Sequence, residues 1–400
     1  MKITLRKVFF KLNDLIFSHY SLSSVARVKT YCLRKGGAQY KVLNAQQKTV
    51  SAPVKYINEP QREPVRCILP EQYIAIIPNA RVIGRSNAIL TEDLCFLYDL
   101  LCDETKYRVS DCAIFRKYPF GETKYILSYK KTNDKIEAGI YLDCNYSNNY
   151  YHFLYESAIK FYLLNQYDID ESVPVLVGES VRLIPQLSEI VSILAKNRKV
   201  IYIKRKETCS VKTLYYPSFV NFIPPNFKNS NEIKTEDVIF DFKALNYLRD
   251  TILKKVDLEK AKFRPKKIFI SRKNALRRSY NENEIIDLVV KLGYTVVSPE
   301  MMTFIEQVEM FNNADDIIAA TGAALSNLLF CHDNCSVLCL ISERYELSIF
   351  SNLAFISNVD LEYLASIKTY SNDNIQHGFI VDINTLKDYL QAKEQVSENI

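Results

Sequence analysis

Residues 267–272 read Lys-Ile-Phe-Ile-Ser-Arg, and residues 316–322 read Asp-Ile-Ile-Ala-Ala-Thr-Gly. Each stretch begins as a short β-prone run and ends in polar or small residues, which is the pattern of a buried strand followed by a loop. Two further apolar runs lie at 295–297 and 336–341. Helical patterns separate the four runs, so this half of the chain predicts a doubly wound sheet of parallel strands.

The three helices between these strands carry start and stop signals. The first begins in a capping-box pattern at 281–284 and ends before Gly293, a residue type that often follows a helix. Thr303, with Glu306 three residues later, marks the start of the second helix. Gly322 leads into the third. These signals predict where the loops of the sheet lie.

The first half of the chain alternates in the same way but less regularly. Apolar runs and helical patterns follow one another and predict βαβ units. The strands are expected at 139–143, 173–177 and 200–203, and the helices at 149–166 and 185–195. Short β-prone runs between 67 and 129 predict a small antiparallel appendage that precedes these units.

Polar, proline-containing stretches suggest the boundaries between parts of the chain. Pro217, Pro224 and Pro225 interrupt regular structure, so we expect a domain junction between 219 and 236. The chain then comprises an amphipathic helix with a connector, two Rossmann-like α/β domains, the first of them with the β-rich appendage, and a C-terminal segment that packs back on the domains. Their ranges are 1–66, 67–230, 231–345 and 346–400.

Composition limits the classes of partner. The net charge of +6 is spread over 400 residues, without the concentrated basic stripe of a nucleic-acid-binding protein. The basic excess fits anionic small molecules or a membrane surface better. Ten cysteines lie mostly in apolar runs, where a thiol behaves as a small buried apolar group, and this favours a reducing, cytoplasmic location.

The first 17 residues form a basic amphipathic pattern, and no run of about 18 apolar residues occurs anywhere in the chain. A helix over 1–17 could lie on an anionic membrane as a peripheral contact. It could equally pack on the domain surface. The sequence leaves both interpretations open.

Candidate binding residues lie where strands of the second half end, because parallel sheets bind ligands beyond the carboxyl ends of their strands. The loop after residue 270 contains Arg272, Lys273, Arg277 and Arg278. Arginine side chains match phosphate oxygens in a bidentate way, so this loop suits a diphosphate. The alternative is an ordinary solvated basic loop.

The turn at 321–327 is the second candidate. Small residues let a ligand approach the backbone, and the amides at the start of the following helix attract negative charge. The alternative is that small residues only allow close helix packing. The residues of this candidate are Thr321, Gly322, Ala323, Ala324, Ser326 and Asn327.

In the first half, Asn149, His152, Glu156 and Lys160 recur at helical spacing and form one polar stripe on an aromatic helix. The helix follows a predicted strand, which brings Asn149 and His152 to the ligand-binding rim. Either His152 or Glu156 could act as a general base. The alternatives are a solvent-exposed helix face and a structural histidine.

Metal ligands are poorly supported, and we expect no metal cofactor. Asp168 and Asp170 have the spacing of a divalent-ion motif but precede a strand, at the wrong end of the sheet. Cysteine and histidine also cluster between residues 331 and 339. These residues lack the paired spacing of a zinc site.

Taken together, these blocks resemble glycosyltransferase family 61. The similarity runs from about Pro78 to Ile341 and is strongest in 267–272, 303–308 and 322–328. Residues 149–156, Asn-Tyr-Tyr-His-Phe-Leu-Tyr-Glu, are similar to a family segment of the form Asn-Tyr-aromatic-His-Trp-hydrophobic-x-Glu.

The resemblance implies a GT-B arrangement, in which two facing Rossmann domains bind the acceptor (67–230) and a nucleotide-sugar donor (231–345). It implies inverting, metal-independent transfer to a hydroxyl of a glycan or lipid-linked glycan, in bacterial capsule or lipopolysaccharide biosynthesis. Arg272 would meet the donor diphosphate, and 322–327 the nucleotide side. The family usually has histidine before the glycine of this turn, where this chain has Thr321. Threonine can donate a hydrogen bond but cannot carry positive charge.

Two other functions fit the same patterns. A sugar-nucleotide epimerase can also be built from Rossmann-like domains, and it would need no acceptor. A catalytically silent protein that binds sugar nucleotides or assists assembly is the other alternative, because Thr321 replaces the family histidine.

Overall fold

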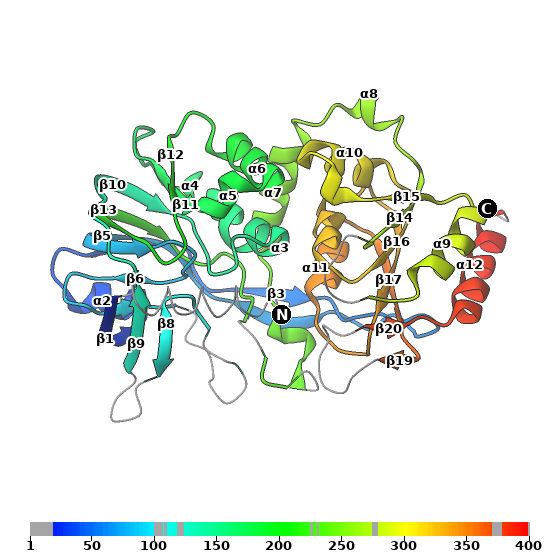
Figure 1. The fold of residues 1–400 in the computed structure, drawn as a ribbon, viewed down its shortest axis with the longest axis horizontal. Coiled ribbons are helices and arrows are strands. Elements are labelled where there is room, and N and C mark those ends of the chain that lie inside the picture. The colour runs from blue at the N-terminus through cyan, green and yellow to red at the C-terminus, as the bar shows by residue number, and fades with distance from the viewer. Residues whose placement is uncertain are drawn as a thin grey trace, which may run out of the picture. The chain divides into compact units, whose positions relative to one another are not determined.

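The computed structural model describes residues 19–99, 107, 110–117, 124–224, 227–229, 232–273, 279–369 and 378–398. The chain folds into two compact units. Unit 1 comprises 1–47, 70–220 and 224–226, and unit 2 comprises 48–69, 221–223 and 227–400. Each unit is described by itself (Figure 1). The expected amphipathic helix at 1–17 lies outside the described residues.

In the described residues of unit 1, eleven strands form one mixed sheet, which is accompanied by a set of helices. The strands are β1 (His19–Ala26), β2 (Gln39–Asn44), β5 (Gln72–Ile83), β6 (Ile89–Leu90), β7 (Phe96–Leu97), β8 (Ile114–Lys117), β9 (Lys124–Tyr129), β10 (Lys135–Tyr141), β11 (Val175–Gly178), β12 (Val200–Ile203) and β13 (Thr208–Pro217). The helices are α2 (Val28–Arg34), α3 (Tyr150–His152), the π-helical η1 (Phe153–Ser157), the 3₁₀ turn η2 (Ala158–Lys160), α4 (Phe161–Leu164), α5 (Glu179–Leu183) and α6 (Pro185–Ala195).

The predicted βαβ units are present, because β12, β11, β10 and β13 lie side by side and pair in parallel. The predicted appendage, however, is not a separate element. β13 pairs in antiparallel fashion with β5 from Thr208 to Pro217, and β5 leads on through β6 and β7 to β1, β9 and β8. Hydrogen bonding along this long pair joins the β-rich region to the parallel strands in one sheet.

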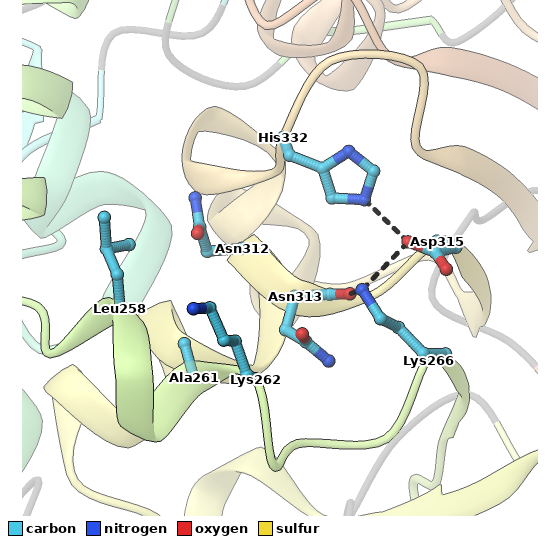
Figure 2. A pocket seen from close by; sticks show the side chains of 8 residues that line it. All are labelled: Leu258, Ala261, Lys262, Lys266, Asn312, Asn313, Asp315 and His332. Atoms are coloured by element: carbon cyan, nitrogen blue, oxygen red, sulfur yellow. Dashed lines mark hydrogen bonds and ion pairs between the residues drawn. The ribbon is translucent and has the colours of Figure 1, made fainter.

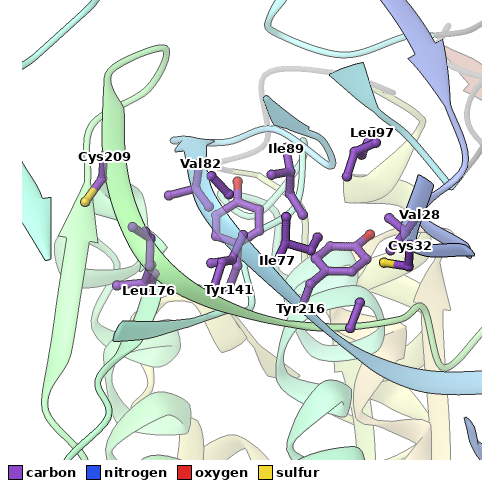
Figure 3. Packing of buried hydrophobic residues seen from close by; sticks show 14 of the residues in the cluster. Val28, Cys32, Ile77, Val82, Ile89, Leu97, Tyr141, Leu176, Cys209 and Tyr216 are labelled. Carbon is purple, nitrogen blue, oxygen red and sulfur yellow. The ribbon is translucent and has the colours of Figure 1, made fainter. Parts of the chain in front are cut away.

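The core of unit 1 lies against this sheet and is rich in tyrosine (Figure 3). Tyr141, at the end of β10, is fully buried, and its hydroxyl lies 2.7 Å from the carbonyl oxygens of both Ile83 and Ser86. A buried hydroxyl needs such a partner. Tyr141 therefore connects β10 to the turn that follows β5.

Unit 2 is built on five parallel strands in the order β15-β14-β16-β17-β18. They are β14 (Lys267–Ile270), β15 (Thr295–Val297), β16 (Asp316–Ala320), β17 (Ser336–Ile341) and β18 (Asp360–Ala365). The four predicted strands are confirmed, and β18 is a fifth that the sequence analysis did not identify. In chain order the arrangement is 2-1-3-4-5, so the direction of winding changes between β14 and β16.

Helices and short elements surround this sheet, and α9 and α12 pack on one face through Ile285, Val289, Leu386 and Leu390 (Figure 1). The helical elements are η4 (Thr235–Asp237), α7 (Phe242–Leu253), α8 (Leu258–Ala261), α9 (Glu282–Lys291), η5 (Pro299–Met301), α10 (Phe304–Asn313), the 3₁₀ helix η6 (Ala323–Phe330), α11 (Ile349–Ile356) and α12 (Ile383–Glu398). The remaining strands are β3 (Gln47–Ser51), β4 (Val65–Leu69), β19 (Lys368–Thr369) and β20 (Phe379–Ile380).

Helix signals in unit 2 were mostly identified correctly. Thr303 and Glu306 form a capping box at the start of α10, and Gly293 follows α9 with a φ of 81°. Asn281 does not cap α9 with its side chain, because its amide exchanges hydrogen bonds with the backbone of Val381. No helix in the described part of the chain has the length and apolar character needed to cross a bilayer.

Residues 48–66, expected in the N-terminal connector, and 67–69, expected in the first α/β domain, fold with unit 2. A buried polar cluster connects this segment to the rest of the unit. Asn352 accepts a hydrogen bond from the Ala52 amide at 2.8 Å, and its own amide donates to Ser51 Oγ at 3.1 Å. Ser51 Oγ donates to the carbonyl of Thr235 at 2.8 Å. Because these groups are buried, each depends on the others for a partner.

We predict that Asn352→Ala lowers the free energy of unfolding of unit 2 by about 1–3 kcal/mol, since it leaves the buried Ala52 amide without an acceptor. Urea unfolding measures this. Gln391→Ala, at an exposed site on α12, is the control and should change stability by about 0.5 kcal/mol or less. Equal effects of the two substitutions would contradict the structural role of Asn352.

Candidate functional site

Arg272 lies in the loop that directly follows β14. Its backbone amide donates to Glu282 Oε1 at 2.7 Å, and its Nη1 donates to the carbonyl oxygen of Thr321. Glu282 stands at the start of α9 and is buried. The loop after β14 is therefore fixed from one side by α9 and connected on the other to the turn after β16.

Gly322 allows the guanidinium of Arg272 to lie against the backbone of this turn. A Cβ atom at position 322 would overlap Arg272 Nη1. The φ of Gly322 is 171°, which is extended backbone open to any residue, so the glycine is needed for space and not for conformation. Arg272 and Gly322 thus form one surface, as the sequence predicted for a shared binding site.

The other predicted residues of the turn differ in exposure. Ala323 and Ala324 are partly exposed at the start of η6, whose first turn leaves backbone amides without helical partners. Ser326 and Asn327 are fully buried. The Asn327 amide donates to Gln307 Oε1 of α10 at 3.0 Å, which holds η6 in place.

Of the basic residues predicted in the loop after β14, Lys273 is exposed next to Arg272. Arg277 and Arg278 lie outside the described residues.

Arg272 and Thr321 follow two strands that are neighbours in the sheet of unit 2. β14 and β16 are neighbours, and the winding changes direction between them. In open parallel sheets, ligands bind beyond the carboxyl ends of the strands at this switch point. Arg272 follows β14 and Thr321 follows β16, so both predicted loops lie at the switch point of unit 2.

In unit 1, Asn149 begins the predicted helix as its N-cap. Its side-chain oxygen accepts from the amides of Tyr151 at 3.0 Å and His152 at 3.4 Å. The helix then continues as the π-helical turn η1. Such turns are rare and often occur at functional sites.

His152 and Glu156 form a close pair across this turn. His152 Nδ1 lies 2.5 Å from Glu156 Oε1, and the side chain of His152 is 29% exposed while that of Glu156 is buried. The His152 ring also stands 4.9 Å from the ring of Tyr146, measured between centroids. In the tautomer whose Nδ1–H donates to the Glu156 carboxylate, Nε2 is the acceptor atom of the ring.

Lys160 completes the stripe but does not face solvent. It is fully buried, and its Nζ donates to the carbonyl oxygen of Asp143 at 3.4 Å and lies 5.2 Å from the centre of the Phe219 ring. Burial lowers the pKa of this amine, because charging it costs solvation energy. The polar stripe is therefore directed into unit 1, and the solvent-face interpretation is wrong for Glu156 and Lys160.

Two buried carboxyl groups near this helix were not identified from the sequence as candidates. Asp143 accepts from the amides of Arg85 at 2.6 Å and Cys144 at 3.0 Å, and burial raises its pKa despite these bonds. Burial likewise raises the pKa of Asp111 to about 6. The sequence signal that could have identified Asp143 as a candidate is its position shortly after β10. Nothing local in the sequence distinguishes Asp111.

A cavity of about 300 Å³ in unit 2 lies elsewhere. It is lined by Leu258, Ala261, Lys262, Lys266, Asn312, Asn313, Asp315 and His332 (Figure 2). Lys266 directly precedes β14, and Asp315 directly precedes β16. The cavity therefore lies near the amino ends of the strands, away from Arg272 and Thr321.

The candidate metal ligands have other partners. His332 Nε2 lies 3.0 Å from Asp315 Oδ1, and Asp170 accepts from the Ser172 amide at 2.8 Å in a turn. Among the described residues, no three His, Cys, Asp or Glu side chains are grouped closely enough to hold a metal ion.

The Arg272 guanidinium and the turn that begins with Gly322 lie at the switch point of a parallel sheet. This is an architecture that proteins use to bind phosphorylated ligands. Residues 135–338, just over half of the chain, match the family Glycosyltransferase 61. The chain therefore belongs to glycosyltransferase family 61, and it is a glycosyltransferase. No curated protein sequence matches it.

We predict that Gly322→Ala weakens binding of nucleoside diphosphates by roughly tenfold to a hundredfold, because the new Cβ displaces the guanidinium and its charge-assisted hydrogen bonds. Titration calorimetry with a panel of nucleoside diphosphates measures the loss. Gly36→Ala is the control, since nothing lies near a Cβ there. Unchanged affinity in Gly322→Ala would show that the ligand does not use this surface.

Proposed function

We propose that the protein transfers a sugar from a nucleotide-diphosphate sugar to a hydroxyl of a glycan or lipid-linked glycan, with inversion at the anomeric carbon. Family membership favours transfer over an epimerase or a silent binding protein. The observation that carries the proposed donor site is the contact of Arg272 with the turn at Thr321 and Gly322. The two units would act as the two domains of a GT-B enzyme, with the donor bound by unit 2 and the acceptor by unit 1.

In the proposed reaction His152 is the general base and Glu156 orients it. The short Nδ1 to Oε1 distance supports this division of roles, because a carboxylate that accepts from Nδ1 leaves Nε2 to take the acceptor proton. The acceptor oxygen attacks the anomeric carbon as the bond from that carbon to the β-phosphate oxygen breaks. The proton goes to His152, and the nucleoside diphosphate leaves with the bonding electrons.

Arg272 would stabilise the negative charge that grows on the leaving diphosphate. Lys273, Arg277 and Arg278 come from the same loop and would add positive charge. The Ala323 and Ala324 amides and the Thr321 hydroxyl would contribute hydrogen bonds. In this proposal cationic side chains take the role that a metal ion has in other transferases. Asn327 positions η6 through its hydrogen bond to Gln307.

The proposed setting is the assembly of bacterial capsule or lipopolysaccharide in the cytoplasm, at the inner face of the membrane. The resemblance to such enzymes supports it. The basic amphipathic pattern of residues 1–17 supports a peripheral contact with an anionic membrane.

We expect Arg272→Ala to lower kcat/KM about 10²-fold or more, because it removes charge stabilisation in the transition state. Arg272→Lys should recover part of the loss, since it keeps the charge without the bidentate geometry. Donors are first identified by the thermal stabilisation that nucleotide sugars give, and transfer is then followed by product analysis. Arg66→Ala, at an exposed site in unit 2, is the control. Full activity of Arg272→Ala would exclude this role.

We expect His152→Ala and Glu156→Gln each to reduce kcat by roughly 10²- to 10⁴-fold while donor binding is kept. Glu137→Gln, at an exposed site in unit 1, should leave kcat unchanged. Full activity of His152→Ala would assign the base to another group.

A further inference from the structure

The connection from α7 to β14, residues 254–266, is a basic and largely exposed segment of unit 2. It contains six lysine or arginine residues and two acidic ones. In Figure 1 it forms an arch with α8 in its middle, raised from the rest of unit 2. Nothing in the proposed transfer reaction uses this segment.

Two large apolar side chains project from this basic segment. Phe263 is 90% exposed and Leu258 is 57% exposed. A single exposed apolar residue is common on protein surfaces. Here two lie within six residues of each other, and basic residues surround them.

The basic side chains of the segment are accessible as well. Lys254, Lys255, Lys260, Lys262 and Lys266 are all exposed. Three of them have acidic neighbours: Lys262 pairs with Glu259, Lys260 with Glu309 and Lys266 with Asp315. The Lys262–Glu259 and Lys266–Asp315 pairs are exposed and weak, so these two lysines can exchange them for another anion at little cost, whereas the Glu309 partner of Lys260 is buried.

The base of the segment is firmly attached to α10. Arg264 pairs with the buried Glu309 at 2.7 Å, and the Asn313 amide donates to the carbonyl oxygen of Arg264 at 2.6 Å. Ala261, at the end of α8, is buried. The neighbours of Phe263 in the chain are thus held in place while its ring remains exposed, so little ordering is needed for this ring to bind.

We propose that residues 254–266 dock unit 2 on a membrane that contains anionic phospholipid. Phe263 and Leu258 enter the interfacial region, and the lysines contact the headgroups. This combination of apolar and cationic side chains is what binds proteins to anionic bilayer surfaces. The cavity of Figure 2 shares Leu258, Ala261, Lys262 and Lys266 with the segment.

The chain contains no tryptophan, so Phe263→Trp introduces a single tryptophan at the proposed contact, which can be excited selectively at wavelengths where tyrosine does not absorb. With vesicles of phosphatidylcholine and phosphatidylglycerol, we expect its emission to shift to shorter wavelength and to be quenched by brominated lipid. Vesicles of phosphatidylcholine alone should give little change. Phe115→Trp, at an exposed site in unit 1, is the matched control and should not respond.

Binding is then measured by co-sedimentation with the same anionic vesicles. Phe263→Ser should weaken partitioning about tenfold or more, and Lys262→Gln about fivefold, with a further loss at high salt. Neither substitution should change transfer to a water-soluble acceptor, which separates this proposal from the proposed function.

Two results would overturn the proposal. One is vesicle binding by the Phe263→Trp variant with unchanged tryptophan emission, which would assign the contact to another segment. The other is an emission shift that depends on protein concentration without lipid, which would show that a second copy of the chain covers Phe263.

Discussion

The site in unit 2 depends on the guanidinium of Arg272 lying against a backbone that has no side chain. Thr321 offers its carbonyl oxygen, Gly322 offers the space, and Glu282 holds the Arg272 amide from the other side. This geometry exists because β14 and β16 are adjacent although they are not consecutive in the chain. A change in strand order would separate Arg272 from Thr321 and Gly322, so the proposed donor site depends on the topology of the sheet.

Much of unit 2 could be predicted from sequence because each signal there is local. Apolar runs of three to five residues mark β14, β16 and β17, and the Thr303 capping box marks α10. β18 was missed because its run, Asp-Leu-Glu-Tyr-Leu-Ala, is interrupted by acidic residues and is not continuously apolar. Glu282 was seen only as part of a helix start. Its bond to Arg272 depends on tertiary structure, which spacing alone does not reveal.

Unit 1 was harder to predict because more of its contacts depend on tertiary structure. The pairing of β13 with β5 joins residues more than a hundred positions apart, and no short pattern shows it. The sequence identified the polar stripe on the candidate helix, but it did not show whether the stripe faces solvent or the interior of unit 1. Lys160 resembles a surface lysine in sequence, whereas Phe219 and the carbonyl of Asp143 surround it in the fold. The roles of Asn149, His152 and Glu156 remain predictions that rest on geometry.

The wide turn at Phe153–Ser157 contains one residue more than a regular helical turn. Removing one residue from this turn would restore 3.6 residues per turn and leave the two flanking segments close to their present orientation. The spacing of His152 and Glu156 would shorten from i,i+4 to i,i+3, so the distance between the imidazole and the carboxylate would change without any substitution at either position. Related chains that differ here by one residue should be compared with this in mind.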